Sequence, residues 1–354
     1  MERAVLSSRG HRPFRRMASD DDCDSGALVT RYLARKTLLY LLTFFVAVTI
    51  DWAIPRLMPG NPIDGLISRI QADSTASQEL HGYFTESFGL DQPLWRQYID
   101  FWRGLLHGDL GPSIAYVGST VSELIWAAIP YTLALLIPAI VLSYIAGNRV
   151  GAMAARRKVL DNTALPVAYV LTATPYMWLA IMLVYFLSFK LGLFPVSGAY
   201  DFSLQPAWSL EFARSFISHW FLPFLTLFLV SFGGWAIGMR NLIIYELESE
   251  YTNYLQALGA PTKLVRKYAY GNAVLPQMSG LALALGAVVG GALVTEIVFG
   301  YPGIGQALVQ AVSARDVPYV LSVGLLIAAV YVSLNVIADL IVVLLVPKLR
   351  TAVQ

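Results

Sequence analysis

The stretch NYLQALGAPTKLVRKYAYGNAVLP, residues 253–276, is polar and helix-forming, and it lies between two long apolar runs. Gly259 stands near its start, and Leu275 and Pro276 end it. A charged side chain at the centre of a bilayer costs about 2.5–3.5 kcal/mol, so a segment with several lysines and arginines belongs outside the hydrocarbon. Its meaning therefore depends on the side of the membrane on which it lies.

The composition is that of an integral membrane protein. Of 354 residues, 56% are hydrophobic and 14% are charged, whereas an ordinary soluble domain has roughly 25% charged residues. The net charge of +2 gives no argument for a nucleic-acid partner. Cys23 is the single cysteine, which excludes an internal disulfide and a multi-cysteine zinc site.

Six apolar runs are long enough to cross roughly 30 Å of hydrocarbon as helices. The first is LLYLLTFFVAVTIDWAIPRL from Leu38, and the others lie at about 124–147, 164–188, 219–239, 274–298 and 319–346. We therefore predict an all-α integral membrane protein with six transmembrane helices. Its expected parts are a flexible tail at 1–30, a first helix and external loop at 31–122, and a five-helix core at 123–354, with the opening stretch in a loop at about 241–273.

Lysine and arginine are divided unevenly between the two sides of this arrangement. Thirteen of them flank the first span, the loop at 148–163, the opening stretch and the C-terminal end, against seven over much longer segments on the other side. The positive-inside rule then predicts that both termini and the opening stretch are cytoplasmic.

The external loop at 58–122 contains its own amphipathic helix. Apolar residues recur at helical spacing in PLWRQYIDFWRGLLHG, which predicts a short helix outside the membrane. They are Leu94, Tyr98, Phe101, Trp102 and Leu105. Two roles for this helix remain possible: it covers the ends of the spanning helices as a lid, or it contacts an external partner.

Motifs for bond chemistry are absent from the sequence. It has no G-x-x-x-x-G-K-[ST] phosphate loop, no H-E-x-x-H metal pattern and no G-x-S-x-G nucleophile turn, and its four histidines are scattered. This favours a conduit over a catalyst. A secondary transporter and a membrane enzyme remain alternatives, although neither a charged midplane site nor a catalytic constellation is evident.

Four polar residues inside the expected spans are candidates for a translocation path. Asp51 and Glu296 lie near outer ends of spans, whereas Asn335 and Asp339 lie one turn apart on one helix face. Such residues normally face a bundle interior or a water-filled path. Hydrogen bonding that only holds the bundle together is the competing interpretation.

Small residues and prolines indicate how the spans pack and bend. Gly286 and Gly290 form a G-x-x-x-G step that lets another helix approach closely. Four prolines interrupt the second and third spans, and each frees a carbonyl that can bend a helix or line a cavity. They are Pro130, Pro138, Pro166 and Pro175.

The opening stretch resembles the cytoplasmic E-A-A…G…LP loop of binding-protein-dependent ABC importer permeases, in the oligopeptide and dipeptide subgroup. The matching positions are Tyr251, Ala257, Gly259, Arg266, Asn272, Ala273, Leu275 and Pro276. Further segments resemble the same subgroup in order along the chain: RLMPGNP (56–62), FGLDQPLWRQYIDFWRGLLHGDLGPSI (88–114), the segment at 173–198, EIVFGYPGIGQALVQAVSARDVPYV (296–320) and NVIADLIVVLLVPKLR (335–350). The chain departs from the pattern at 253–255, where Asn, Tyr and Leu stand for E-A-A, and at Asn61.

The resemblance implies the type I importer permease fold in the inner membrane, with a short coupling helix that docks on an ATPase. The residues assigned to that contact are Tyr254, Ala257, Leu258, Gly259, Ala260, Thr262 and Arg266. It further implies a second homologous permease, two ABC ATPase subunits and an extracytoplasmic solute-binding protein. ATP and Mg would be bound by the ATPases, with no cofactor in this chain. The implied substrates are short peptides or oligosaccharides.

Overall fold

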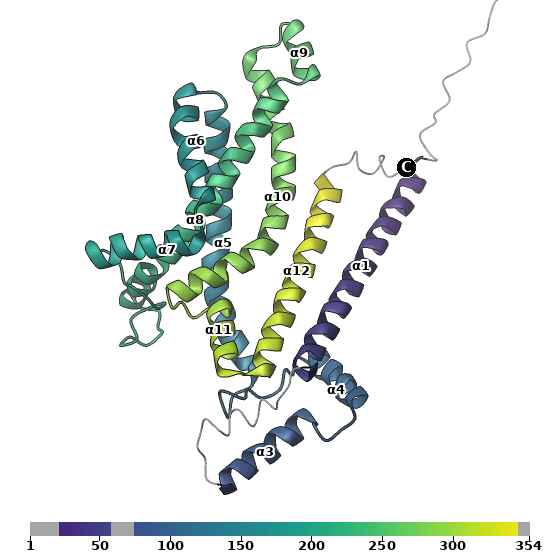
Figure 1. The fold of residues 1–354 in the computed structure, drawn as a ribbon. Helices are drawn as coiled ribbons and strands as arrows, with labels where there is room; N and C mark the ends of the chain where they lie inside the picture. Colours follow the sequence, from purple (N-terminus) through teal and green to yellow (C-terminus); the bar gives the residue numbers. More distant parts are fainter. Residues whose placement is uncertain (1–20, 58–73, 346–354) are drawn as a thin grey trace, which may run out of the picture.

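The computed structural model describes residues 21–57 and 74–345 of the chain. These residues are mostly helical and contain no β-strand (Figure 1). The helices are α1 (Asp21–Leu57), α3 (Ser74–Phe88), α4 (Leu94–His107), α5 (Val121–Ala154), α6 (Lys158–Ala173), α7 (Tyr176–Leu183) with a π-helical continuation (Val184–Lys190), α8 (Leu210–Leu247), α9 (Glu250–Ala257), α10 (Thr262–Val298), α11 (Ile304–Ala314) and α12 (Val317–Leu345).

Four described helices have the length and composition of a membrane span. They are Ala34–Ile54 within α1, Val121–Ala154, Leu210–Leu247 and Val317–Ile337. A fifth is added if α6 and the helix that follows it form one broken span. The expected run at 274–298 lies within α10, but the side chains at 282–291 are outside the described residues. The structure thus supports four or five spans and leaves the count of six a prediction.

The expected span at 164–188 is broken at Pro175, one of the four prolines predicted to bend a helix, whereas Pro166 lies inside α6. Its two parts are bent by 106° where α6 gives way to α7. Thr174 is extended, at φ −80° and ψ 124°, and Pro175 follows it. A proline cannot donate a backbone hydrogen bond and drives the preceding residue out of the helical region, so the break falls here.

Helices α5 and α8 form the close-packed centre of the molecule. A Cβ added to Gly151 of α5 would lie 2.2 Å from the carbonyl oxygen of Ala236 in α8, and one added to Gly147 would lie 2.6 Å from Trp235 Cβ. The two helices can approach this closely only because glycine stands at both positions. This G-x-x-x-G step is not the one expected from sequence, since the packing of Gly286 and Gly290 lies outside the described side chains.

Helix α6 packs on α8 by the same means. A Cβ on Gly233 would lie 2.4 Å from the Ala168 carbonyl oxygen and 2.3 Å from Thr172 Oγ1. Small residues on α5 and α8 therefore set the spacing of all three helices.

Helices α1 and α12 run side by side at one flank (Figure 1). The beginning of α1 and the end of α12 both point toward the end of the molecule that carries α9. Residues 1–20 of the expected tail lie outside the described residues, and the tail is already helical from Asp21. Most apolar side chains of α1 are exposed, as befits a helix that faces lipid.

The amphipathic helix expected in the external loop is confirmed as α4, at the end of the molecule opposite α9. Its Tyr98 hydroxyl lies 2.8 Å from Thr49 Oγ1, and its Trp102 ring stacks on Phe45 of α1. One face of α4 therefore packs against α1, while Leu94 is exposed.

Candidate functional site

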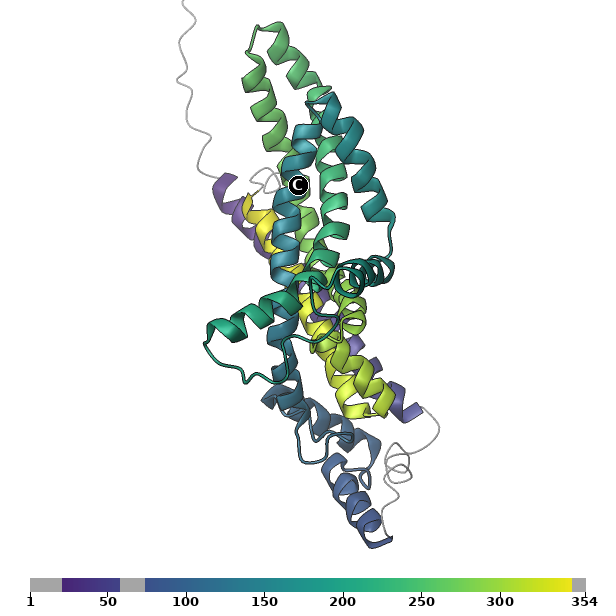
Figure 2. The ribbon, with the colours of Figure 1, turned by 90° about the vertical axis from the view of Figure 1, so that its left-hand side faces the viewer.

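Helix α9 lies at one tip of the molecule, between the ends of α8 and α10 (Figures 1 and 2). It ends in a left-handed glycine, Gly259 at φ +76°. The Ala260 N–H donates to the Leu255 carbonyl at 3.0 Å, and the Gly259 N–H donates to the Gln256 carbonyl at 2.9 Å. These two bonds are the Schellman arrangement that closes a helix C-terminus. Pro261 then precedes the first turn of α10, so Gly259 ends one helix and Pro261 stands at the beginning of the next.

A carboxylate at the end of α8 joins all three helices at this tip. Glu246 Oε2 accepts hydrogen bonds from the Tyr251 hydroxyl of α9 at 2.7 Å and from the Asn272 amide of α10 at 3.4 Å. Burial and the Glu246 hydrogen bond raise the pKa of Tyr251, so its hydroxyl remains a neutral donor. Tyr251 and Asn272 are two positions at which the chain resembles the importer permeases, and Glu246 gives them a shared structural role.

The buried hydroxyl of Thr252 closes the turn between α8 and α9. Its Oγ1 lies 2.8–3.1 Å from the carbonyl oxygens of Glu246, Leu247 and Ser249. The orientation of α9 is therefore held by side-chain contacts on both sides of the turn.

The seven residues assigned to docking lie together on and beside α9. Tyr254 and Leu258 are one turn apart and are 66% and 65% exposed. Ala257, Gly259, Thr262 and Arg266 are exposed too, and Ala260 is half-buried. An exposed apolar pair at the end of so short a helix is typical of a protein contact.

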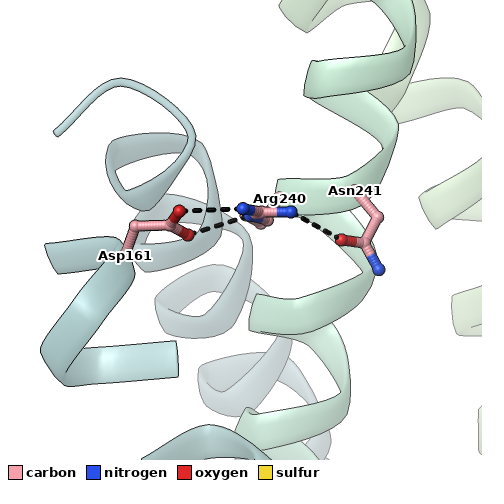
Figure 3. A network of polar contacts seen from close by, with 3 residues as sticks. All are labelled: Asp161, Arg240 and Asn241. Carbon is pink, nitrogen blue, oxygen red and sulfur yellow. Dashed lines mark hydrogen bonds and ion pairs between the residues drawn. The ribbon is translucent and has the colours of Figure 1, made fainter. Parts of the chain in front are cut away.

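An ion pair fixes α6 to α8 below this tip (Figure 3). Arg240 Nε and Nη2 donate to the two carboxylate oxygens of Asp161 at 2.9 and 2.8 Å, and Arg240 Nη1 lies 3.4 Å from Asn241 Oδ1. Two parallel bonds between a guanidinium and a carboxylate add geometric precision as well as energy. The pair therefore ties α6 to α8, the helix that precedes α9.

Glu296, a candidate path residue in α10, has its side chain fully buried against the beginning of α11. Its Oε1 accepts from the Thr132 hydroxyl at 2.7 Å, and its Oε2 accepts from the backbone N–H groups of Gly305 at 2.6 Å and Gln306 at 3.3 Å. Thr132 Oγ1 in turn accepts from the Ile304 N–H at 2.8 Å. The first N–H groups of a helix have no partner within the helix, and here a carboxylate and a hydroxyl supply one.

The glycines of the YPGIG turn leave the space that Glu296 fills. A Cβ on Gly303 would lie 2.2 Å from Glu296 Oε1, and one on Gly305 would lie 2.8 Å from Oε2. Sequence reasoning missed this cluster, Thr132 included, although a carboxylate followed by a glycine-rich turn before a helix was the available signal.

We expect loss of the Glu296 carboxylate to destabilise the protein. Glu296→Leu leaves the N–H groups of Gly305 and Gln306 buried without acceptors, which costs on the order of 2 kcal/mol. Glu296→Gln keeps one acceptor oxygen and should lose less. Thermal unfolding of the full chain in detergent measures the order wild type, Gln, Leu. Unchanged unfolding temperatures with altered transport would instead indicate a residue of the path.

A second buried carboxylate, Asp316, plays the same part for α12 and was also missed. Its Oδ2 accepts from the Ser113 hydroxyl and from the Ala115 N–H at 3.0 Å, and its Oδ1 accepts from the Tyr319 N–H at 3.2 Å. Asp316 thereby ties the segment before α5 to the beginning of α12.

The other three candidate path residues do not join Glu296. Asp51 is half-buried against α12, where a Cβ on Gly324 would lie 3.1 Å from its Oδ1. The Asn335 amide donates to the carbonyl of Tyr331 in its own helix at 2.7 Å. The backbone of Asp339 belongs to α12, while its side chain lies outside the described residues. Metal-ligand side chains form no group of three or more in the described parts of the chain.

The fold and this site define a helical membrane protein that carries a short, exposed helix, held by side-chain hydrogen bonds, at one tip. Residues 147–351 match the family described as "Binding-protein-dependent transport system inner membrane component". The chain belongs to this family.

Named relatives resemble nearly the whole chain. The di/tripeptide transport system permease protein DppB of Pseudomonas aeruginosa is 29% identical over 339 residues, covering 90% of this chain and 98% of the relative. The probable D,D-dipeptide transport system permease protein DdpB of Escherichia coli is 31% identical, covering 85% and 92%. The oligopeptide transport system permease protein AppB of Bacillus subtilis is 28% identical, covering 90% and 99%.

Membership establishes the broad function. The chain is an inner-membrane permease component of an ABC transport system and not an enzyme. Dependence on a binding protein implies substrate-binding and ATPase partners. The resemblance of the opening stretch to such permeases is confirmed.

Proposed function

We propose that the chain is one permease subunit of an ATP-driven importer that moves short peptides into the cytoplasm. It has six spanning helices with both termini cytoplasmic. Helix α10 is the sixth span, in addition to the four single helices and the broken pair α6–α7. A second, homologous permease completes the path. Two ATPase subunits dock on the cytoplasmic tips, and a solute-binding protein delivers substrate from outside.

The observation that carries this proposal is α9 with its exposed Tyr254 and Leu258. A helix of eight residues gains little stability by itself, yet Glu246 and Thr252 hold this one in place. A surface that is both apolar and rigidly held suits a contact that must transmit force.

The transmission runs through the contacts already described. ATP binding brings the ATPase subunits together and displaces α9. The Glu246 cluster passes that displacement to α8 and α10, and the Arg240–Asp161 pair passes it to α6. The path then opens toward the binding protein, and hydrolysis resets it.

Peptides are favoured as substrates because the relatives' names specify di/tripeptides, D,D-dipeptides and oligopeptides. The oligosaccharide alternative has no comparable support. An ATP-independent secondary transporter would have no use for a rigidly held α9.

Reconstitution with the partner subunits tests the function. This chain is assembled in proteoliposomes with a second permease, the ATPases and the binding protein of its transport system, and uptake of labelled di- and tripeptides is measured. We expect uptake only with ATP and the binding protein together. Uptake driven by an ion gradient without ATP would contradict the importer, and ATP-dependent uptake of oligosaccharides but not of peptides would contradict the substrate.

A further inference from the structure

Four cations and a tyrosine surround a hollow of about 340 Å³ beside the α9 tip. We name it the basic hollow, and its lining residues are Arg156, Lys263, Arg266, Lys267 and Tyr270. The last four recur at i, i+3, i+4 and i+7, so they share one face of the first two turns of α10. Arg156 faces them from the turn between α5 and α6.

The charge of the basic hollow is not compensated within the described parts of the chain. No described carboxylate lies within ion-pairing distance of its four cations. The two half-buried carboxylates at this end are engaged elsewhere, Glu246 with Tyr251 and Asp161 with Arg240. Cations that converge on one hollow without a counter-charge repel each other, and an anion between them relieves that repulsion.

The packing of α5, α8 and α10 indicates how deep the basic hollow lies in the bilayer. Ala152 of α5, Met239 and Ile243 of α8, and Ala273 of α10 form one buried cluster about a helical turn deep. Arg156 follows Ala152 by four residues and Tyr270 precedes Ala273 by three, so the hollow lies directly beyond this apolar cluster. The polar layer of a bilayer begins where the apolar part of a span ends and is about 5–8 Å thick on each side, which is the depth that the hollow would occupy.

Exposed tyrosines support this depth. Tyr245, Tyr268 and Tyr270 are 71%, 53% and 37% exposed, and all three lie within a few turns beyond the buried cluster. Tyrosine side chains are enriched at the headgroup level, where the ring contacts apolar chains and the hydroxyl contacts water.

We propose that the basic hollow binds the phosphate of an anionic phospholipid headgroup. Guanidinium and ammonium groups donate charge-assisted hydrogen bonds to phosphate oxygens, and the Tyr270 hydroxyl is a further donor. Basic pockets between spanning helices on the cytoplasmic side recognise headgroups in this way. Because α10 follows the α9 turn directly, a lipid held here would brace the tip. The proposal does not depend on which solute is transported.

Lipid binding to the full chain tests the proposal. The protein is purified in neutral detergent and titrated with phosphatidylglycerol or phosphatidylcholine, and bound lipid is counted by native mass spectrometry. We expect phosphatidylglycerol to be preferred. The triple variant Lys263→Gln, Arg266→Gln, Lys267→Gln should reduce that preference at least about tenfold, since each cation near an anionic surface contributes about fivefold.

Two matched variants test whether total charge or the loss of particular side chains, and not charge in the basic hollow, explains the result. Arg96→Gln, Lys190→Gln, Arg214→Gln removes the same charge from exposed positions elsewhere and should keep the preference. Lys263→Arg, Lys267→Arg preserves charge in the basic hollow and should keep it too. Gel filtration and thermal unfolding verify that each variant is folded. Equal binding of both lipids, or a preference that survives the triple variant, would overturn the proposal.

Two further arms separate other anions from lipid. If inorganic phosphate binds and is lost in the triple variant while phosphatidylglycerol does not bind, the hollow takes a soluble anion and the lipid proposal fails. If the triple variant keeps its bound lipid but no longer co-purifies with the ATPase subunit, the occupant is an acidic protein surface, and the lipid proposal fails again. Peptide uptake by the unaltered, reconstituted importer is measured separately, so failure of the lipid proposal is distinguished from failure of the transport function.

Discussion

Gly259→Val is expected to abolish ATP-driven uptake while the membrane-spanning helices stay folded. Gly259 lies at φ +76°, a conformation that strains side chains other than glycine, and β-branched ones most. The strain of about 1–2 kcal/mol shifts the turn against its native form by roughly five- to thirtyfold. The Schellman bonds of Ala260 and Gly259 would open, and α9 would leave the position set by Glu246. ATP hydrolysis by the partners should continue without transport.

The surroundings of Gly259 make the control decisive. A Cβ at this position meets no atom within 4 Å, so any effect comes from backbone conformation and not from collision. Gly259→Asn should therefore keep most of the uptake, because asparagine tolerates the left-handed region. Gly259→Ala should fall between the two. Uptake and ATPase activity are measured together in proteoliposomes, and equal transport by the Val and Asn variants would remove Gly259 from the coupling role.

The helices themselves were largely predictable from the sequence, but their course was not. An apolar run of about 20 residues predicts a helix across the bilayer because backbone groups in hydrocarbon must be paired. Prolines look alike in sequence, yet Pro130 and Pro138 lie inside a continuous α5 whereas Pro175 begins a helix after a 106° bend. Whether a helix continues through a proline depends on the neighbours that satisfy the freed carbonyl, and these come from elsewhere in the chain.

The parts of the candidate docking site that depend on one short stretch of sequence were predictable. The parts that depend on contacts between separate helices were not. Gly259 and Pro261 end one helix and begin another by their own backbone preferences, so a single stretch was enough to find the turn. Glu246 could not be found in this way, because its role requires Tyr251 and Asn272 to be brought together from two other helices. Glu296 shows the converse, since its polarity within a span was visible while its partners at Thr132 and Gly305 were not.

Gly151→Val is expected to separate α5 from α8 and to produce the largest loss of stability of any single change considered. The Cβ alone would lie 2.2 Å from the Ala236 carbonyl oxygen and 3.0 Å from Met239 Cβ. Backbone atoms cannot rotate away as side chains do, so the helices must move apart. Overpacking usually costs about 1–3 kcal/mol, and the backbone collision here places the expected cost at or above about 3 kcal/mol.

Gly234→Val is the matched control because it adds the same side chain to a spanning helix of the same pair. A Cβ on Gly234 meets nothing within 4 Å, so the substitution changes stability only through the small difference in helix propensity between glycine and valine. Thermal unfolding and gel filtration in detergent should show a large fall in unfolding temperature for Gly151→Val and almost none for Gly234→Val. Equal unfolding temperatures would mean that α5 and α8 do not pack through Gly151, and the transmission from α9 through α8 would lose its rigid support.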